Sequence, residues 1–397
     1  MLTDLGVLRV SPRERELMDR LGRLSSGSGS HSPGLATMQR ALPETRVDID
    51  ACFLSNPLAT DLFWRHFNSD VLEDRALFKR MLEAYPSQNR VVAERLSSAI
   101  GVDRGRIFIA NGATEAIQAI IHNYSSQIHI NIPTFSPYYE FAGPEHEVTT
   151  FELDSEDDFA IDPGRYVQSV LRSGADTAVL ISPNNPDGYL VPDDDLHWIL
   201  SKLSGLRTVI VDESFVHFAD RPVAGDELPT LVGITKQFDN VTVVKSMSKD
   251  FGIAGIRAGY AIMRPSRVNR LLDHGYLWNT SGIAEYFFSL FARPGFLDEY
   301  RRVLDMYRGY IDRFTLMTAD ADFIRTYPTS ANFQLLEMPE GVSAELVTAL
   351  LLIRYGVYVR CCNDKIGLDG EFIRVAIRTE PENELVVAAL ADVLRHA

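Results

Sequence analysis

The sequence has 397 residues but only three cysteines and no apolar run that could cross a membrane. Cys52, Cys361 and Cys362 are too few for a disulfide framework, and no CxxC pair or HExxH motif predicts a zinc site. The first twenty residues, MLTDLGVLRVSPRERELMDR, lack the apolar core of a signal peptide. These absences predict a soluble, cytoplasmic protein that binds neither metal nor membrane.

Positive charge is also scarce, with 39 Lys and Arg against 54 Asp and Glu, a formal net charge of −15. Such a surface repels nucleic acid, so we expect no nucleic-acid partner, and an anionic small substrate would need a locally basic pocket. The GxGxxG and GxxxxGK[ST] motifs are absent, which argues against dinucleotide and nucleoside-triphosphate binding.

Short apolar, β-branched runs are present in the middle of the chain. They are five to seven residues long, are bounded by Gly, Pro or Asn, and alternate with helical stretches, which is typical of strands buried on both faces. The six runs are RIFIANG (106–112), QIHINIP (127–133), TAVLISP (177–183), RTVIVDES (207–214), VTVVKS (241–246) and AGYAIM (258–263). We therefore predict an α/β fold with a mainly parallel, seven-stranded-type sheet between helices.

The pattern changes after residue 285. A long amphipathic helix is predicted over 295–317, followed by strands in ANFQLLEM, GVYVRCC and EFIRVAIRT and by a last helix in ENELVVAALADVLRH. We divide the chain into an N-terminal arm that forms part of a small α+β domain (1–60), a large cofactor-binding domain (61–289) and a small C-terminal domain (290–397). The Ser/Gly-rich stretch 24–34 fits either a lid or a connector without a role.

Polar residues follow the predicted strands, at the sheet edge where α/β proteins bind ligands. Lys249 follows a buried strand, and partial desolvation would favour the neutral amine needed for a Schiff base, although a surface lysine before a helix is an alternative. Asp212 ends an apolar run, where it could hold a proton on a pyridine nitrogen or simply cap a helix. Gly112, Ala113 and Thr114 open a helix whose free amides could bind phosphate.

Six segments together carry a specific resemblance: ANGATEA, PTFSPYYEF, SPNNPDG, VDESF, SMSKDFGIAGIRAG and IRVAIRTEPEN. In this order and spacing they resemble fold type I pyridoxal-phosphate enzymes of the class I/II aminotransferase group, and most closely the histidinol-phosphate aminotransferase and threonine-phosphate decarboxylase branch. The resemblance runs from about residue 45 to 395. It implies an aspartate aminotransferase-like fold and pyridoxal 5′-phosphate as cofactor.

The resemblance also implies roles for individual residues. Lys249 would form the Schiff base with the cofactor and move the Cα proton, while Asp212 would pair with the pyridine nitrogen. Tyr138 would stack on the ring and Asn185 would donate to its phenolic oxygen. The phosphate would be held by Ala113, Thr114, Ser246, Ser248 and Arg257, together with Tyr85 from the partner subunit of a homodimer. A core tyrosine in a monomer is the alternative for Tyr85.

The substrate side is implied in the same way. Arg374 matches the arginine that binds the substrate anion, and Asn56 lies in a segment, LSNPLATDLF, that resembles one closing over the substrate. Arg360, fourteen residues before Arg374, would help to bind a second anionic group, or else pairs with an acid on the surface. The expected substrate is a small amino acid or 2-oxo acid carrying phosphate, phosphonate (as in phosphonopyruvate and phosphonoalanine) or a second carboxylate.

The main functional prediction from the sequence is a transaminase, in which the amino group is exchanged through Lys249. A departure from the family pattern keeps an alternative open: Phe215 stands where a tyrosine usually donates to the phenolic oxygen. Loss of that donor should raise the pKa of the Schiff base. The alternative is a pyridoxal-phosphate lyase, either a decarboxylase of a phosphorylated amino acid or an eliminating or cyclising enzyme. A non-catalytic regulator would need an added DNA-binding domain, for which the first 45 residues are too few.

Overall fold

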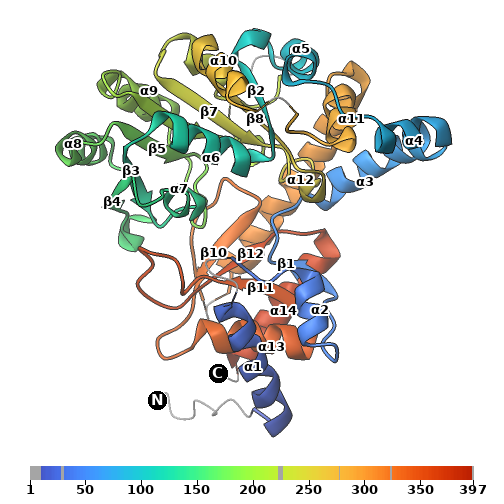
Figure 1. Ribbon diagram of the computed structural model, residues 1–397. Coiled ribbons are helices and arrows are strands. Elements are labelled where there is room, and N and C mark those ends of the chain that lie inside the picture. The colour runs from blue at the N-terminus through green and yellow to red at the C-terminus, as the bar shows by residue number, and fades with distance from the viewer. Residues whose placement is uncertain (1–9, 28–30, 222–226, 277, 322–323, 396–397) are drawn as a thin grey trace. The chain divides into compact units, whose positions relative to one another are not determined.

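The computed structural model describes residues 10–27, 31–221, 227–276, 278–321 and 324–395. The chain divides into two compact units: a large unit of Ser55–Asn185 and Tyr189–Tyr307, and a small unit of Met1–Leu54, Pro186–Gly188 and Arg308–Ala397 (Figure 1). Residues 55–60 and 290–307, which the sequence analysis places in the flanking segments, belong to the large unit in this division.

The large unit is built on a seven-stranded sheet with the order β2-β8-β7-β6-β5-β3-β4. Its strands are β2 (Ile107–Asn111), β3 (Gln127–Ile132), β4 (Glu147–Glu152), β5 (Thr177–Ile181), β6 (Thr208–Asp212), β7 (Val241–Ser246) and β8 (Ala258–Ile262). Only β8 is antiparallel to its neighbours. The predicted α/β fold with a mainly parallel sheet is confirmed, and β4 is the strand that the sequence analysis missed.

Helices cover this sheet because its central strands are apolar on both faces. Every residue of β5, β6, β7 and β8 is buried, and side chains of α6 join those of the sheet in one hydrophobic cluster. Helix α6 packs on β2, β8 and β7 (Figure 1). The helices of the large unit are α3 (Pro57–Phe67), α4 (Arg75–Glu83), α5 (Asn89–Ile100), α6 (Ala113–Tyr124), α7 (Pro137–Glu140), α8 (Pro163–Ser173), α9 (Asp193–Lys202), α10 (Pro265–Asp273) and α11 (Gly282–Phe291).

Short turns of 3-10 or π-helix complete the large unit. They are η1 (Asn68–Leu72), a π-helix, and the 3-10 turns η2 (Arg104–Arg106), η3 (Ser155–Asp157), η4 (Val216–Phe218), η5 (Val232–Lys236) and η6 (Ala254–Ile256). Helix α12 (Pro294–Ala319), which the sequence analysis places at 295–317, begins in the large unit and ends in the small one.

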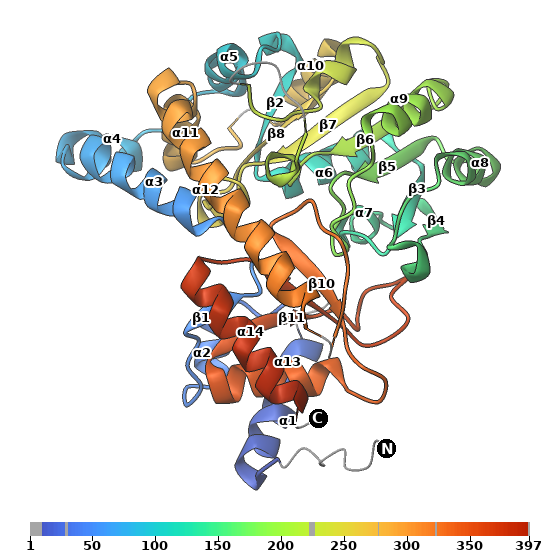
Figure 2. The ribbon, with the colours of Figure 1, turned by 180° about the vertical axis from the view of Figure 1, so that it is seen from behind.

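The small unit holds a five-stranded sheet with the order β1-β11-β12-β10-β9. Its elements are α1 (Pro12–Ser26), α2 (Leu35–Ala41), β1 (Ile49–Ala51), β9 (Arg325–Thr326), β10 (Phe333–Glu337), α13 (Ala344–Tyr355), β11 (Val357–Cys361), β12 (Phe372–Ala376) and α14 (Glu380–Arg395). The N-terminal segment joins this unit through β1, which pairs with β11 in parallel. Helix α13 packs against β11, α14 and α1 (Figure 2).

The Ser/Gly-rich stretch is only partly a loop. Its first three residues, 24–26, form the end of α1, and residues 28–30 lie outside the described part of the chain. Within the described residues, no helix is long and apolar enough to span a membrane. The three cysteines are free thiols, and the described residues contain no group of three or more side chains suited to a metal ion.

Candidate active site

The large unit brings the ends of β2, β7 and β8 together around a tight backbone contact. Gly259 of β8 is in register with Ala110 of β2 on one side and with Ser246 of β7 on the other. A Cβ atom on Gly259 would lie 2.6 Å from the amide nitrogen of Ala113. Only glycine therefore allows the start of α6 to come this close to the sheet.

Arg257 lies beside the same turn. Gly112 has φ +77°, and a Cβ there would meet the Arg257 guanidinium at 2.5 Å. Arg257 itself has a left-handed backbone, φ 63°, and its Nη1 donates to the carbonyl of Ala254 at 3.1 Å. The Arg257 guanidinium thus lies next to the first amides of α6, and together these hydrogen-bond donors suit a dianion.

Two serine hydroxyls follow β7. The Ser246 Oγ accepts a hydrogen bond from the Ser248 amide at 3.2 Å. The Ser248 Oγ is buried and has no hydrogen-bond partner. A buried hydroxyl without a partner is costly, so a ligand oxygen is a natural complement to Ser248.

Asp212 is the last residue of β6 and is almost fully buried. The Tyr138 hydroxyl donates to its Oδ2 at 2.8 Å, and the Ser214 amide donates to its Oδ1 at 2.9 Å. Burial raises the pKa of Asp212 even with these donors. A cation placed against this carboxylate would stabilise its charged form, as the ring nitrogen assigned to it would. Asn185, which follows β5, is also buried.

Lys249 lies on a segment whose backbone is fixed by a neighbouring helix. Its carbonyl accepts hydrogen bonds from the amides of Asn56, at 3.0 Å, and Gly252, at 3.3 Å. Gly252 has φ +64° and no room for a Cβ, which would lie 2.3 Å from the Asn56 carbonyl. Thr60 of α3 donates to the Gly252 carbonyl at 2.8 Å.

Asn56 has a structural role that the sequence analysis did not foresee. Its Oδ1 caps α3 by accepting from the amides of Leu58 and Ala59, at 3.1 and 3.2 Å. Its Nδ2 is buried without a hydrogen-bond partner, so one donor remains available to a ligand.

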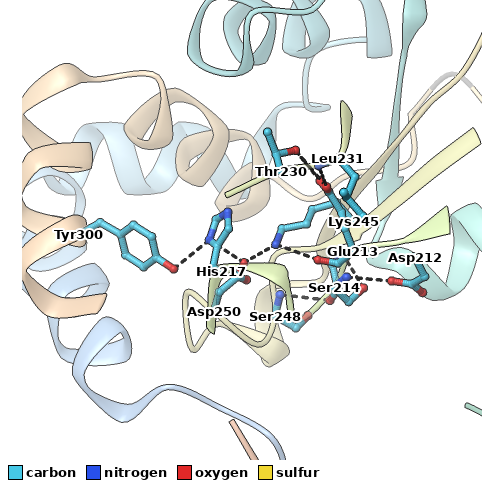
Figure 3. A network of polar contacts seen from close by, with 11 residues as sticks. Asp212, Glu213, Ser214, His217, Thr230, Leu231, Lys245, Ser248, Asp250 and Tyr300 are labelled. Atoms are coloured by element: carbon cyan, nitrogen blue, oxygen red, sulfur yellow. Dashed lines mark hydrogen bonds and ion pairs between the residues drawn. The ribbon is translucent and has the colours of Figure 1, made fainter. Parts of the chain in front are cut away.

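Asp250, the residue after Lys249 in the chain, belongs to a buried charged network that the sequence analysis missed (Figure 3). Lys245 pairs with Asp250 at 2.6 Å, and the same Asp250 oxygen lies 2.9 Å from the Nδ1 of His217. His217 Nδ1 is also 3.0 Å from the hydroxyl of Tyr300. The signal that could have found it is a lysine inside the apolar run VTVVKS, because a buried ammonium needs a carboxylate nearby.

Glu213 lies at the other end of this network. Both of its carboxylate oxygens accept from the Thr230 hydroxyl, and one accepts from the Leu231 amide. Burial raises the pKa of Glu213 to about 7, against the attraction of Lys245. For Asp250 burial acts in the same direction, but Lys245 and His217 outweigh it and hold the pKa below its usual value.

In the small unit, Arg360 and Arg374 are directly opposite each other on the antiparallel strands β11 and β12. Opposite residues on paired strands point to the same face of a sheet, and like charges placed there destabilise it. Arg360 forms a two-fold hydrogen bond with Asp364, at 2.7 and 2.6 Å, and Arg374 donates to the Cys52 carbonyl at 3.1 Å. Arg360 therefore has an acid partner, as the alternative expected, but its own side chain is mostly buried and not on the surface.

A third cation, Lys365, belongs to the same cluster. It is 9% exposed; burial lowers its pKa, and Arg360 and Arg374 lower it further. Burial raises the pKa of the nearby Cys52 thiol to about 11, so this thiol stays neutral. Within this cluster, Asp364 accepts hydrogen bonds from Arg360 and lies near the charges of Lys365 and Arg374.

Tyr85 is not a core residue, because 87% of its surface is exposed. Its ring lies 6.1 Å from that of Trp278, which is also exposed. The chain next to it is fixed, since the amide and hydroxyl of Ser87 donate to Glu285 at 2.8 and 2.6 Å.

Residues 73–390 match the family described as aminotransferase class I and II. The chain is 43% identical to an L-serine phosphate decarboxylase of Campylobacter jejuni over 98% of its own length and 100% of the relative's. It is 40% identical to an L-serine phosphate decarboxylase of Sulfurospirillum multivorans, over 97% and 98%. The solved structure of a decarboxylase from S. multivorans has a TM-score of 0.92 at 39% identity, covering 97% of this chain and 98% of that one.

The branch expected from the sequence is confirmed. The structure of a histidinol-phosphate aminotransferase from Clostridium acetobutylicum matches with a TM-score of 0.76 at 25% identity, over 88% of this chain and 100% of that one. The prediction of a transaminase is wrong: the relatives that match the chain end to end are decarboxylases. The decarboxylase alternative agrees with them. The sequence analysis gave Asp212 and Lys249 the same roles in both reactions, so these residues could not separate the two.

The expected cofactor, pyridoxal phosphate, is confirmed by the family and by these relatives. The residues described above fit it. The partnerless Ser248 hydroxyl, the amides of α6 and Arg257 suit a phosphate, and Asp212, buried with a raised pKa, suits a protonated ring nitrogen.

Proposed function

Because the chain belongs to the aminotransferase class I and II family, we propose that it is a pyridoxal-phosphate-dependent decarboxylase of L-serine phosphate. The observation that carries the proposal is the end-to-end similarity to two L-serine phosphate decarboxylases, at 43% and 40% identity. In this reaction the carboxylate leaves Cα as carbon dioxide and a proton replaces it. The product is O-phosphoethanolamine.

We assign the cofactor-binding residues to the large unit. Ala113, Thr114, Ser246, Ser248 and Arg257 would hold the phosphate, and Asp212 would hold the proton of the ring nitrogen. Bound in this way, pyridoxal phosphate supplies a cationic ring that accepts the electron pair left at Cα when the carboxylate departs. The raised pKa of Asp212 supports this assignment, since a cationic partner compensates a buried carboxylate.

Tyr138 would have two roles, stacking on the cofactor ring and donating a hydrogen bond to Asp212. Its hydroxyl donates to Asp212 at 2.8 Å, which fixes the carboxylate and favours its charged form. Asn185 remains the donor proposed for the phenolic oxygen, where Phe215 offers none. Lys249 is the residue that would bind the cofactor covalently and, once released, deliver a proton to Cα.

The small unit supports a substrate with two anionic groups. Arg360, Lys365 and Arg374 place three positive charges in one cluster of a chain whose net charge is −15. An arginine binds a carboxylate through two hydrogen bonds, and phosphate attracts further cations. We assign Arg374 to the substrate carboxylate and Arg360 with Lys365 to the phosphate. Asn56, with its buried partnerless Nδ2, would donate a further hydrogen bond.

We also propose that the active form is a homodimer. Tyr85 is 87% exposed on a backbone fixed by the Ser87–Glu285 hydrogen bonds, and we assign it to the cofactor phosphate of the partner subunit. A Tyr85→Phe variant should weaken cofactor binding without changing the dimer measured by sedimentation.

Product analysis tests the reaction. The purified protein is incubated with pyridoxal phosphate and L-serine phosphate, with and without 2-oxoglutarate, and carbon dioxide and O-phosphoethanolamine are measured. We expect both products in equal amounts and independently of 2-oxoglutarate. Formation of glutamate faster than release of carbon dioxide would overturn the proposal.

Substrate specificity is measured by comparing L-serine phosphate with L-serine and with L-threonine phosphate. We expect kcat/KM for L-serine to be lower than for L-serine phosphate by at least about 100-fold, because the phosphate contacts are lost. In the variant Arg360→Gln, kcat/KM should fall for L-serine phosphate and stay unchanged for L-serine, so the ratio of the two values becomes smaller.

A further inference from the structure

The Lys245–Asp250–His217 network connects two segments that are far apart in sequence. Lys245 donates to the main-chain carbonyl of Glu213 at 3.2 Å and pairs with the side chain of Asp250 at 2.6 Å. Glu213 directly follows Asp212, and Asp250 directly follows Lys249. One ammonium group therefore joins the backbone carbonyl of the residue after Asp212 to the side chain of the residue after Lys249 (Figure 3).

The segment after Lys249 is fixed on its second side by aromatic packing. Phe251 stacks on Tyr300, with ring centroids 4.2 Å apart, and meets Phe291 edge to face at 5.4 Å. Tyr300 also reaches His217, whose Nδ1 faces Asp250. The two residues after Lys249 are thus held by strand β7, by the turn η4 and by helix α12.

Stability alone does not account for a charged pair at this place. Lys245 and Asp250 are 1% and 0% exposed, and a buried ion pair is often no more stabilising than apolar side chains of similar volume. The remaining residues of β7 from Val241 to Val244 are apolar or Thr, so an apolar side chain would suit the strand equally well. What the pair does provide is a fixed distance between two loops.

We propose that Lys245, acting through Asp250, is a positioning residue that fixes Lys249 relative to Asp212. The two functional groups act on opposite ends of the same small ring, so their separation must be held to within about 0.5 Å. This role rests on the assignment of Lys249 as the cofactor-binding lysine and is independent of whether the reaction is decarboxylation.

The test replaces the charged pair by apolar residues. In the double variant Lys245→Met/Asp250→Leu both charges of the pair are removed together, His217 keeps the Tyr300 hydroxyl as a partner, and Glu213 keeps Thr230 and Leu231. The thermal midpoint of the cofactor-free protein should therefore stay within a few degrees of wild type. The rate at which added pyridoxal phosphate becomes joined to Lys249, followed by absorbance and by mass spectrometry after borohydride reduction, should fall by about 10- to 100-fold. In steady-state kinetics kcat should fall with little change in KM.

Arg267→Met is the matched control. Arg267 is a buried cation that reaches the same two strands at their other ends, bonding Thr208 of β6 at 3.1 Å and Thr242 of β7 at 3.4 Å. This variant should lower the thermal midpoint yet attach the cofactor within about two-fold of the wild-type rate.

Attachment at the wild-type rate in the double variant would overturn the proposal. If the double variant does not fold, Lys245→Met takes its place, because it removes the ammonium and leaves Asp250 facing His217; a wild-type rate there is equally decisive against the proposal. Attachment of the cofactor to a lysine other than Lys249 in the wild-type protein would instead refute the assignment of Lys249.

Discussion

The two units of the molecule arrange their buried charged side chains differently. In the large unit the buried cation Lys245 is matched by Asp250, and the carboxylates Asp212 and Glu213 each accept hydrogen bonds. In the small unit Arg360 and Arg374 lie directly opposite each other, with Lys365 in the same cluster.

This difference matches the two kinds of ligand that we assign to the units. In the large unit, the buried Ser248 hydroxyl has no hydrogen-bond partner and burial raises the pKa of Asp212, so both groups suit a cofactor that brings a phosphate and a protonated ring nitrogen. In the small unit, the positive charges of Arg360, Lys365 and Arg374 lie close together and would attract an anionic substrate. The comparison leads to four predictions, from the largest effect to the smallest.

Lys249→Ala removes the central group of the large unit. We expect kcat to fall by at least about 1,000-fold, because both covalent attachment of the cofactor and proton delivery to Cα are lost. The absorbance band near ~420 nm of the lysine-bound cofactor should disappear. Substrate binding, measured by calorimetry, should persist, since the cations of the small unit are untouched. Retention of the band would contradict the assignment.

Arg374→Lys changes the small unit while keeping its charge. A lysine cannot form the two parallel hydrogen bonds of a guanidinium, so kcat/KM should fall by about 10- to 100-fold. Cofactor affinity, measured by absorbance titration, should be unchanged. A variant that loses cofactor as readily as substrate would break the division between the units.

The pH dependence of stability should have opposite signs for Glu213 of the large unit and Glu14 of the small unit. For Glu213, whose pKa is raised to about 7, the folded chain keeps a proton that the unfolded chain releases above its ordinary pKa of 4.5. Stability should therefore fall as pH rises from about 4.5 to 7, by at most about 1.4 kcal/mol per pH unit. Chemical denaturation at pH 5.5 and 7.0 measures this slope, which Glu213→Gln should reduce.

Glu14 of the small unit provides the contrast. Its hydrogen bond with Arg354 lowers the pKa of Glu14 to about 2, so its contribution is complete above 4.5 and is lost only as pH falls toward 2. Glu14→Gln should leave the slope between pH 5.5 and 7.0 unchanged. An equal change of slope in both variants would show that the two carboxylates do not differ as described.

Phe215→Tyr gives the smallest expected effect. The new hydroxyl would restore a donor to the phenolic oxygen of the cofactor, which should lower by about one unit the pKa at which the visible band titrates. Spectra recorded between pH 5 and 10 measure the midpoint. An unchanged midpoint would mean that residue 215 does not reach the phenolic oxygen.

Apolar runs bounded by turn residues were enough to predict the central sheet. Strands β5, β6 and β7 are buried over their whole length, so their sequences carry a strong signal. Strand β4, with the sequence EVTTFE, lies at the sheet edge and has no fully buried residue, which is why hydrophobicity could not reveal it. Helix α1 was missed for a related reason, since its described side chains include only one buried residue, Leu17.

For the candidate site, the sequence indicates some of the residues but not the contacts between them. Motifs point to Asp212 and Lys249 because both residues occur in short, ordered segments, and their roles stay predictions. The pairing of Lys245 with Asp250 and the opposition of Arg360 and Arg374 depend on contacts between segments, which a single sequence does not contain. The choice between transamination and decarboxylation depends on which Cα bond stands perpendicular to the ring, and no residue type encodes that orientation.

The pairing of β1 with β11 sets the order in which the chain can mature during synthesis. Ile49 is opposite Val357, and Leu17, Met38, Leu42 and Cys52 form one apolar cluster with Leu352 and Tyr358. At roughly 5–20 residues per second a ribosome needs on the order of 15–60 seconds to add the intervening chain. Throughout that time β1 and the apolar side chains near it lack the strand and the side chains against which they pack in the folded small unit. The large unit, by contrast, is complete before β11 leaves the ribosome and can fold first.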